Sequence, residues 1–317
     1  MDVIVVGSIV VDLINYVEKF PSIGETVLGY KFSKGFGGKG ANQCVMSKFL
    51  GAKSLIIGKV GDDEFGQEYI RHLKNLSINT DYICINPASS TGVAAITVRK
   101  DDGANQIVIT PGANFTVSIS DIEKAKDIIL MSKVVVCQLE IPLQATYHSL
   151  RIAKENNVLT IFNPAPIPDC GLDLSEMPPV DIFCPNESEA SLVTGIQIKT
   201  VEDAIEAIKY FFLHFSDKVR WPMITLGHLG VVYGESENKT IHFVPAPTVN
   251  AIDSTGAGDC FIGSLAYYFG KCSDVSLNEK VKRSVFLASK SVEKLGTQTS
   301  FPNELDNLDF QYSNETQ

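Results

Sequence analysis

The stretch KVVVCQLEIPLQATYHSLRIAKENNVLTIF, residues 133–162, combines two strand patterns with one helix pattern. Residues 133–139 and 158–162 are short runs rich in β-branched residues, as in strands that are buried on both faces of a sheet. Residues 142–157, between them, carry apolar side chains at helical spacing. This order of strand, helix and strand predicts two parallel strands joined by a crossover helix.

The same alternation continues over most of the chain. Further strand-like runs cover residues 3–7, 54–60, 180–184 and 221–226, and helical spacing recurs over residues 40–51, 64–76 and 201–215. We therefore predict an α/β fold with a doubly wound, mostly parallel sheet flanked by helices. Ligands bind such sheets at the carboxyl ends of the strands.

Two segments interrupt this alternation. Residues 12–36 and 91–110 contain Gly and Pro turns and nearly alternating apolar and polar residues, and DDGAN (101–105) is a hairpin signal. These strands are too few for a separate domain, so we predict a small β-sheet lid whose outer face is a candidate dimer surface. The expected organisation is one domain over residues 1–302, followed by a polar tail over residues 303–317.

The charge and residue composition limit the kinds of molecule that the protein is expected to bind. The chain has 27 basic and 37 acidic residues, a net charge of −10, which argues against sequence-independent binding of nucleic acid. The seven cysteines are an odd number without a C-x-x-C pair, as expected for reduced thiols. Neither a signal peptide nor a membrane-spanning run is apparent. We expect a cytoplasmic protein, with the nucleus as a second compartment, that binds a small molecule.

GFGGKGANQ (35–43) contains G-x-G-x-x-G, but the spacing from the first strand does not suit a dinucleotide-binding turn. The Walker motif also fails, because Gly40 follows Lys39 where Ser or Thr is needed. Two interpretations remain open. The glycines either form a structural entry to a helix or bring Lys39 and Asn42 close to a polyhydroxylated ligand.

Other polar residues adjoin predicted strands. Asp12 and Glu140 fall at the carboxyl ends of predicted central strands, although either could be a turn former or an exposed charge. NESE (186–189) fits a capping box, with Asn186 as the N-cap and Glu189 at the third helical position. TLGHLG (225–230) predicts a tight turn between strands, which could also receive a phosphate or nucleotide.

DSTGAGDCF (253–261) carries the most specific signal. Thr255 to Gly258 offer consecutive backbone donors at the start of an apolar helix, a site that stabilises charge on transferring oxygens. A carboxylate inside this turn would repel a resting anion, so Asp259 needs another function. General base to a hydroxyl that attacks phosphorus is the natural one. A capping role for both Asp253 and Asp259 is less favoured, because one helix needs one cap.

GGKGANQ, the N-x-x-E of NESE, TLG-x-x-G and D-x-T-G-A-G-D occur in the order seen in the ribokinase-like (PfkB-type) carbohydrate kinases. GFGGKGANQCV, VCQLEI, FNPAP and GTQ-S-P resemble the ribokinase branch of that family, of eukaryotic kind. The resemblance runs from about residue 3 to Pro302. It implies the doubly wound fold, a lid shared across a homodimer, and phosphorylation of D-ribose at O5 by MgATP, with activation by potassium.

The resemblance also implies roles for individual residues. Asp259 would be the base, and Gly256, Ala257 and Gly258 would form the anion hole. The sugar would meet Val10, Val11, Asp12, Gly38, Lys39, Gly40, Ala41, Asn42, Glu140 and Asp259. The nucleotide and its Mg²⁺ would meet Asn186, Glu189, Thr225, Leu226, Gly227, His228, Leu229, Gly230, Gly258, Asp259 and Val285. Potassium would be held, mostly by backbone carbonyls, at Asp253, Thr255, Ser291, Lys294, Gly296 and Ser300.

Three positions depart from the family pattern. Val10 stands where many ribokinases have Asn, which removes one expected hydroxyl contact. Val285 replaces the His or Asn that often faces the adenine, and Cys260 replaces Ser or Thr after the base. The alternatives to a ribokinase are a related kinase for another sugar or a nucleoside, and a catalytically idle sugar sensor. A nicotinamide-dependent dehydrogenase is the weakest alternative.

Overall fold

The computed structural model describes residues 1–101, 103–168 and 171–303. The predicted polar tail, apart from Asn303, lies outside the described residues. All six cysteines of the described ranges are free thiols, and four of them are buried. Within the same ranges, no helix is both long enough and apolar enough to span a membrane.

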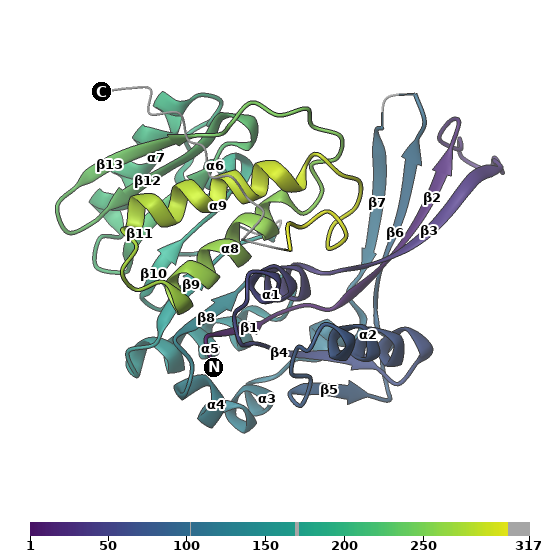
Figure 1. Cartoon of the computed structure of the whole chain (residues 1–317), viewed down its shortest axis with the longest axis horizontal. Helices are drawn as coiled ribbons and strands as arrows, with labels where there is room; N and C mark the ends of the chain where they lie inside the picture. The colour runs from purple at the N-terminus through teal and green to yellow at the C-terminus, as the bar shows by residue number, and fades with distance from the viewer. Residues whose placement is uncertain (102, 169–170, 304–317) are drawn as a thin grey trace.

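A large sheet forms the centre of the molecule (Figure 1). Its strands lie in the order β13 (Thr240–Pro245), β12 (Gly230–Glu235), β11 (Val219–Thr225), β10 (Val180–Phe183), β9 (Leu159–Phe162), β8 (Val134–Cys137), β1 (Val3–Val6), β4 (Ser54–Gly61) and β5 (Ile83–Asn86). All neighbouring strands from β11 to β5 in this spatial order are parallel to each other, and β12 is antiparallel to both of its neighbours, β11 and β13. The predicted doubly wound sheet is confirmed, and β5 and β13 extend it beyond the predicted strands.

Helices cover both faces of this sheet because successive side chains of each strand point to opposite faces. In β1, Val3 and Val5 belong to one buried apolar cluster and Ile4 and Val6 to the other. The first face carries α1 (Lys39–Phe49), α2 (Glu64–Asn75), α8 (Ala257–Lys271) and α9 (Leu277–Ser291). The second carries α3 (Ile119–Lys124), α4 (Lys126–Leu130), α5 (Leu143–Glu155), α6 (Glu187–Thr194) and α7 (Val201–His214).

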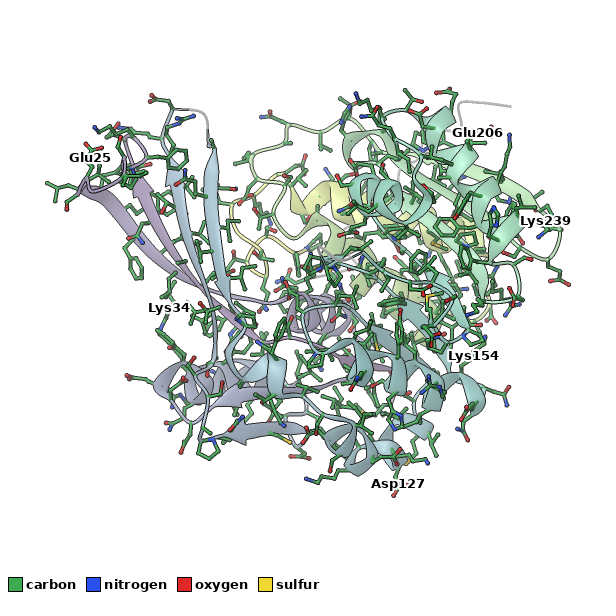
Figure 2. All side chains as sticks on the ribbon, turned by 180° about the vertical axis from the view of Figure 1, so that it is seen from behind. Glu25, Lys34, Asp127, Lys154, Glu206 and Lys239 are labelled. Carbon is green, nitrogen blue, oxygen red and sulfur yellow. The ribbon has the colours of Figure 1, made fainter. Side chains whose placement is uncertain are left out.

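A second, four-stranded sheet extends away from the body as the predicted lid (Figure 1). Its strands lie in the order β3 (Gly29–Gly37), β2 (Val10–Val17), β6 (Gly92–Arg99) and β7 (Asn105–Thr110). Strands β6 and β7 pair antiparallel, as the hairpin signal predicts. Figure 2 shows Glu25 at the tip of the lid and Lys34 nearer its base, where Lys34 forms an ion pair with Glu68 of α2.

The position of Asp12 corrects the sequence analysis. Asp12 does not lie at the carboxyl end of a central strand, because β1 ends at Val6 and Asp12 is the third residue of β2. It pairs with Gly35 of β3 and Ala94 of β6. The alternation over residues 12–36 predicts a lid strand correctly, but the predicted segment begins at Asp12, whereas β2 begins two residues earlier, at Val10. Asp12 therefore approaches the site from the lid.

Candidate active site

The carboxyl ends of β1 and β8 lie next to each other in the sheet. After β1 the sheet continues with β4 on one side of β1, and later with β8 on its other side. Such a reversal of strand order is a preferred ligand position in α/β folds. Ser8 follows β1, and Glu140 follows β8. The Ser8 hydroxyl donates to Oε2 of Glu140 at 2.5 Å, and the same oxygen accepts the backbone N–H of Lys39 at 2.9 Å. Glu140 thus joins both strand ends to the start of α1.

The glycines of GFGGKGANQ allow the loop before α1 to pack closely against β1 and β2. A Cβ atom on Gly37 would lie 2.4 Å from Oδ2 of Asp12, and one on Gly40 would lie 2.5 Å from the backbone nitrogen of Ser8. Lys39, within the same loop, lines the large cavity of the molecule. The structural interpretation of these glycines is therefore correct, and it is compatible with a ligand contact by Lys39.

Four carboxylates and one ammonium group share this region. Burial by itself would lower the pKa of Lys39, but the negative charges of Asp259, Glu140 and Glu189 outweigh it and raise the pKa. Burial, followed by the charges of Glu140 and Asp259, raises the pKa of Asp12 to about 6. The site therefore keeps a cation among carboxylates and makes ionisation of Asp12 less favourable than that of an ordinary aspartate.

The turn that opens α8 presents backbone to the cavity. Gly256 has a left-handed conformation (φ 79°), and a Cβ atom there would lie 2.5 Å from Cγ2 of Thr297. A Cβ atom on Gly258 would meet no atom within 4 Å. The N–H groups in the first turn of a helix have no carbonyl partner within that helix. Gly258 thus leaves an open space beside potential anion donors.

Asp259 is the third residue of α8 and is 7% exposed. Its Oδ2 accepts from the side-chain amide of Asn42 at 2.9 Å, and its Oδ1 accepts from the amide of Gln43 at 2.9 Å. Two neutral amides on α1 therefore orient both carboxylate oxygens. This arrangement suits a group that must be ionised and precisely placed, as a general base must be.

The cavity that contains Lys39, Gly258 and Asp259 has a volume of about 740 Å³, within the range of small-molecule sites. Its other predicted residues are Asn186, Glu189, Thr225, Gly227, His228, Gly230, Gly256, Ala257 and Val285. Its lining also includes apolar side chains, those of Ala246, Pro247, Val249, Val285, Ala288 and Val292. A lining that combines charged and apolar side chains suits a ligand that carries both phosphates and a flat ring.

The two nucleotide motifs of the sequence form the local structures expected of them. Asn186 caps α6 by accepting from the N–H of Glu189 at 2.8 Å, and Oε2 of Glu189 accepts from the N–H of Asn186 at 2.9 Å. This confirms the capping box. Residues 225–230 connect the antiparallel strands β11 and β12, which confirms the tight turn. Leu226 and Leu229 of this turn pack against the core instead of lining the cavity.

On the sugar side, several predicted residues can offer only backbone to a ligand. Val10 and Val11 are buried, and Ala41 belongs to the core beneath α1. Asn42 is also buried, and its amide nitrogen is already bonded to Asp259. The side chains left to meet a sugar are therefore those of Asp12, Lys39, Glu140 and Asp259.

The predicted potassium residues lie on two adjacent loops held together by Asp253. Its Oδ1 accepts from the N–H of Thr255 and its Oδ2 from the N–H of Gly296, both at 2.9 Å, and its own N–H donates to the carbonyl of Val292 at 3.1 Å. The donor set that the resemblance implies, mostly backbone carbonyls, would consist of oxygens, which would suit a hard cation. The remaining predicted residues of this set are Ser291, Lys294 and Ser300. Within the described ranges, no three His, Cys, Asp or Glu side chains gather as a metal site.

The sequence analysis gave no role to several residues of the site. Gln43 bonds Asp259, Asn163 lines the cavity, Ser8 bonds Glu140 and Gln298 bonds Asn42. A signal existed for three of them. Ser8 and Asn163 are polar residues that directly follow parallel strands, and Gln43 lies one helical turn beyond Lys39. Gln298 stands in the GTQ-S-P segment of the resemblance, but its role could not be assigned, because its partners are far away in sequence.

Comparison with known proteins gives consistent matches over the whole chain. The model of the pfkB family of carbohydrate kinases matches residues 1–304. A ribokinase of Mus musculus is 42% identical over 304 residues, which are 96% of this chain and 93% of the mouse protein. A deoxyribokinase of Salmonella typhi is 38% identical and covers 95% of this chain and 96% of its own. The structure of Arabidopsis thaliana ribokinase with ribose and ATP has a TM-score of 0.81 at 27% identity, over 95% of each chain.

Proposed function

The chain belongs to the pfkB family of carbohydrate kinases, and from this premise we propose that it is an ATP-dependent ribokinase. It would transfer the terminal phosphoryl group of MgATP to O5 of D-ribose. The observation that carries the proposal is the buried carboxylate of Asp259, which two amides orient beside the open space at Gly258. The relatives named as ribokinases support ribose as the acceptor.

In this reaction Asp259 acts as the general base. It takes the proton from the 5-hydroxyl while O5 forms its bond to the γ-phosphorus and the bond from that phosphorus to the bridging oxygen of ADP breaks. The amides of Asn42 and Gln43 hold the carboxylate in place, so its orientation does not depend on the substrate. Such positioned proton transfer contributes about 10²- to 10⁴-fold in rate.

The first turn of α8 and Lys39 stabilise the charge that moves with the phosphoryl group. The backbone N–H groups of Gly256 and Gly258 would serve as donors beside the open space at Gly258, whereas the N–H of Ala257 already donates to the carbonyl of Ser254 at 3.2 Å. The raised pKa of Lys39 keeps its ammonium charged near Asp259. Fixed donors that need no reorganisation are the largest contribution to phosphoryl transfer.

The sugar lies between the lid and the body. Asp12 from β2 and Glu140 after β8 offer carboxylate oxygens to the ribose hydroxyls, and Asp259 lies across the site from them. Each hydroxyl that donates to a carboxylate replaces some of the solvation that the half-buried Asp12 and Glu140 and the buried Asp259 lack. Ribose binding therefore relieves the unfavourable crowding of the three carboxylates.

Two cations complete the proposal. Mg²⁺ commonly keeps waters and binds one or two carboxylates besides the substrate phosphates, and Glu187 and Glu189 line the cavity where it would lie. Potassium would be held by the loops that Asp253 joins, where its charge would strengthen the electrostatic field of the anion hole. The oxygen-rich donor set of those loops fits such an ion.

Deoxyribose is the second candidate acceptor. Val10 offers no side-chain hydrogen bond to a sugar hydroxyl, and a deoxyribokinase is among the relatives. A site built to bond a hydroxyl normally rejects the analogue that lacks it, so the missing partner weakens this discrimination. We still expect ribose to be preferred, because Asp12 and Glu140 remain as partners for its hydroxyls.

The test measures ADP release with ribose, 2-deoxyribose, fructose and adenosine, each with and without potassium, and identifies the product by mass spectrometry. Ribose 5-phosphate formed with the highest kcat/KM is the expected result. A higher kcat/KM for 2-deoxyribose or adenosine would assign a related kinase instead. Sugar binding without a phosphorylated product would show that the protein is a catalytically idle sugar sensor.

A further inference from the structure

A continuous chain of hydrogen bonds connects Asp259 with the last residue of the lid strand β3. Asn42 donates to Asp259, and its Oδ1 accepts from Nε2 of Gln298 at 3.0 Å. The same nitrogen of Gln298 donates to the hydroxyl of Tyr69 at 3.0 Å, and Tyr69 donates to the carbonyl of Gly37 at 2.6 Å. Gln298, at the centre of this chain, is 6% exposed.

The two ends of the chain fix the direction of every bond in it. The carbonyl of Gly37 can only accept, so the Tyr69 hydroxyl must donate to it and can then accept from Gln298. The amide nitrogen of Gln298 therefore faces Tyr69, and its second hydrogen points to Oδ1 of Asn42. With its oxygen committed to Gln298, Asn42 must present its NH₂ group to Asp259.

The amide of Gln298 has no alternative orientation of equal energy. Its Oε1 lies 2.9 Å from Nε2 of His72, whose ring stacks on Phe36 with 3.8 Å between ring centroids. Rotating the Gln298 amide would place its oxygen against Asn42 and its nitrogen against His72. The two donor bonds to Asn42 and Tyr69 would be lost by such a rotation in a buried site, whereas the contact with His72 could be made again by the other tautomer of its ring.

We propose that Gln298 is a positioning residue that orients the base Asp259 through Asn42. The proposal rests on the function proposed above for Asp259. Removing the donor of Gln298 would leave the Asn42 oxygen without its partner, so only the bond to Asp259 would still hold the Asn42 amide. The amide, and with it the carboxylate of Asp259, would then be held less firmly in the line of attack. The expected defect lies in kcat, because Gln298 itself does not line the cavity.

The main variants are Gln298→Met and Gln298→Glu. Methionine keeps the length of the side chain without polar atoms, and glutamate keeps its shape but replaces the donor by an acceptor. We expect kcat to fall about 10- to 100-fold, as for other small misplacements of a reacting group, while KM for sugar and ATP stays within about threefold. Gln298→Glu should have the larger effect, since it forces the Asn42 amide to flip.

Two control variants leave the hydrogen bonds from Gln298 to Asn42 and Tyr69 in place. Gln67→Met removes an exposed glutamine amide from α2 and should leave kcat unchanged. His72→Phe removes the partner of the Gln298 oxygen but leaves both donor bonds, so it should lower kcat less than Gln298→Met does. In a double-mutant cycle, Gln298→Met and Asn42→Ala should be strongly non-additive, because both act through the same bond.

Wild-type kcat in Gln298→Met would overturn the proposal, as would additive effects of Gln298→Met and Asn42→Ala. If Gln298→Met does not fold, Gln298→Glu decides by the same criteria. The kinetics use whichever acceptor the wild-type protein phosphorylates, so a preference for another sugar does not affect them. The NMR signals of the Asn42 side-chain amide give a readout without turnover. They should shift in both Gln298 variants and stay unchanged in Gln67→Met, and unshifted signals in the Gln298 variants would overturn the proposal even if the protein phosphorylated no sugar.

Discussion

The side-chain amide of Gln43 donates a hydrogen bond of 2.9 Å to the carboxylate of Asp259, although 216 positions separate the two residues. Helices α1 and α8 bring them together by packing side by side on one face of the sheet. Gly263 permits this approach, because a Cβ atom there would lie 2.6 Å from the carbonyl of Gln43. The site therefore depends on close packing between the first and the eighth helix as much as on the motifs that they carry.

Replacing the base should separate binding from chemistry. In Asp259→Asn, one amide hydrogen bond can be kept but no proton can be accepted, so we expect kcat to fall about 10²- to 10⁴-fold. Ribose and ADP should still bind within a few-fold of the wild-type affinity. Steady-state kinetics and calorimetric titration measure the two quantities. Near-normal turnover in this variant would remove Asp259 from the mechanism.

The two glycines of the proposed anion hole should respond in opposite ways to alanine. Gly258→Ala should fold with unchanged or slightly higher Tm, because its Cβ meets no atom within 4 Å, yet it should lose about 10²-fold in kcat by filling the phosphoryl space. Gly256→Ala should lower stability by about 1–2 kcal/mol, since Gly256 is left-handed and faces Thr297. An active Gly258→Ala enzyme would mean that the phosphoryl group lies elsewhere.

The central sheet could be predicted from sequence because each buried strand and each amphipathic helix carries its own periodic signal. Residues 133–162 contain β8, α5 and β9 within two residues of the expected bounds. The weakly apolar strands β5 and β13 carry no such signal, since they lie at the two edges of the sheet. Asp12 was misplaced because β2 follows β1 after only three residues, and no turn signal separates them.

The motifs of the site could be recognised, but the contacts between them could not. Asp259 and Asn42 were both identified, yet their hydrogen bond depends on the packing of α1 against α8. The same limit applies to Gln298, whose three side-chain partners Asn42, Tyr69 and His72 come from two helices distant in sequence. Spacing along the chain contains no information on such long-range pairs.

The raised pKa of Asp12 predicts a pH-dependent loss of stability. A carboxyl whose pKa rises to about 6 on folding binds protons more tightly in the folded state, so its contribution to stability is present at low pH and is lost as the pH rises toward and through 6. Asp12→Asn removes this effect. We expect the free energy of unfolding of the variant, relative to the wild type, to be higher at pH 7.5 than at pH 5 by on the order of 1 kcal/mol. The variant should therefore exceed the wild type in Tm by more at pH 7.5 than at pH 5.

The same substitution should cost ribose affinity, because Asp12 is proposed to bind a ribose hydroxyl. Thermal unfolding without ligands and calorimetric titration with ribose measure the two effects. Asp62→Asn, at a residue on the loop before α2, serves as a control and should alter neither. An equal change of Tm at both pH values would show that Asp12 is not the group that titrates.

The lid should mediate a homodimer, but through the face that carries Asp12 and not through the outer face that the sequence analysis expects. The register places Ile14, Ile96 and Ile107 side by side on three strands, on the face that also carries Asp12. Ile107 is 48% exposed, and a row of apolar side chains of this kind indicates a contact surface. We expect Ile107→Asp to yield monomers in light scattering, whereas Val108→Asp on the opposite face should leave the dimer intact. A monomeric wild-type protein would refute this assembly.

The last prediction separates the two aspartates of DSTGAGDCF. Asp253 does not contact Asp259, and its carboxylate instead joins the N–H groups of Thr255 and Gly296. In Asp253→Asn, one of these bonds must be lost, because an amide has one acceptor atom where the carboxylate has two. The loops should then hold a potassium ion less well, so half-maximal activation should need about 10-fold more potassium, the loss expected for one charge-assisted contact. At saturating potassium, kcat should return to within a few-fold of the wild-type value. Titration with KCl at constant ionic strength, maintained with choline chloride, measures this shift, and a loss of kcat that potassium cannot restore would place Asp253 in the chemical step with Asp259.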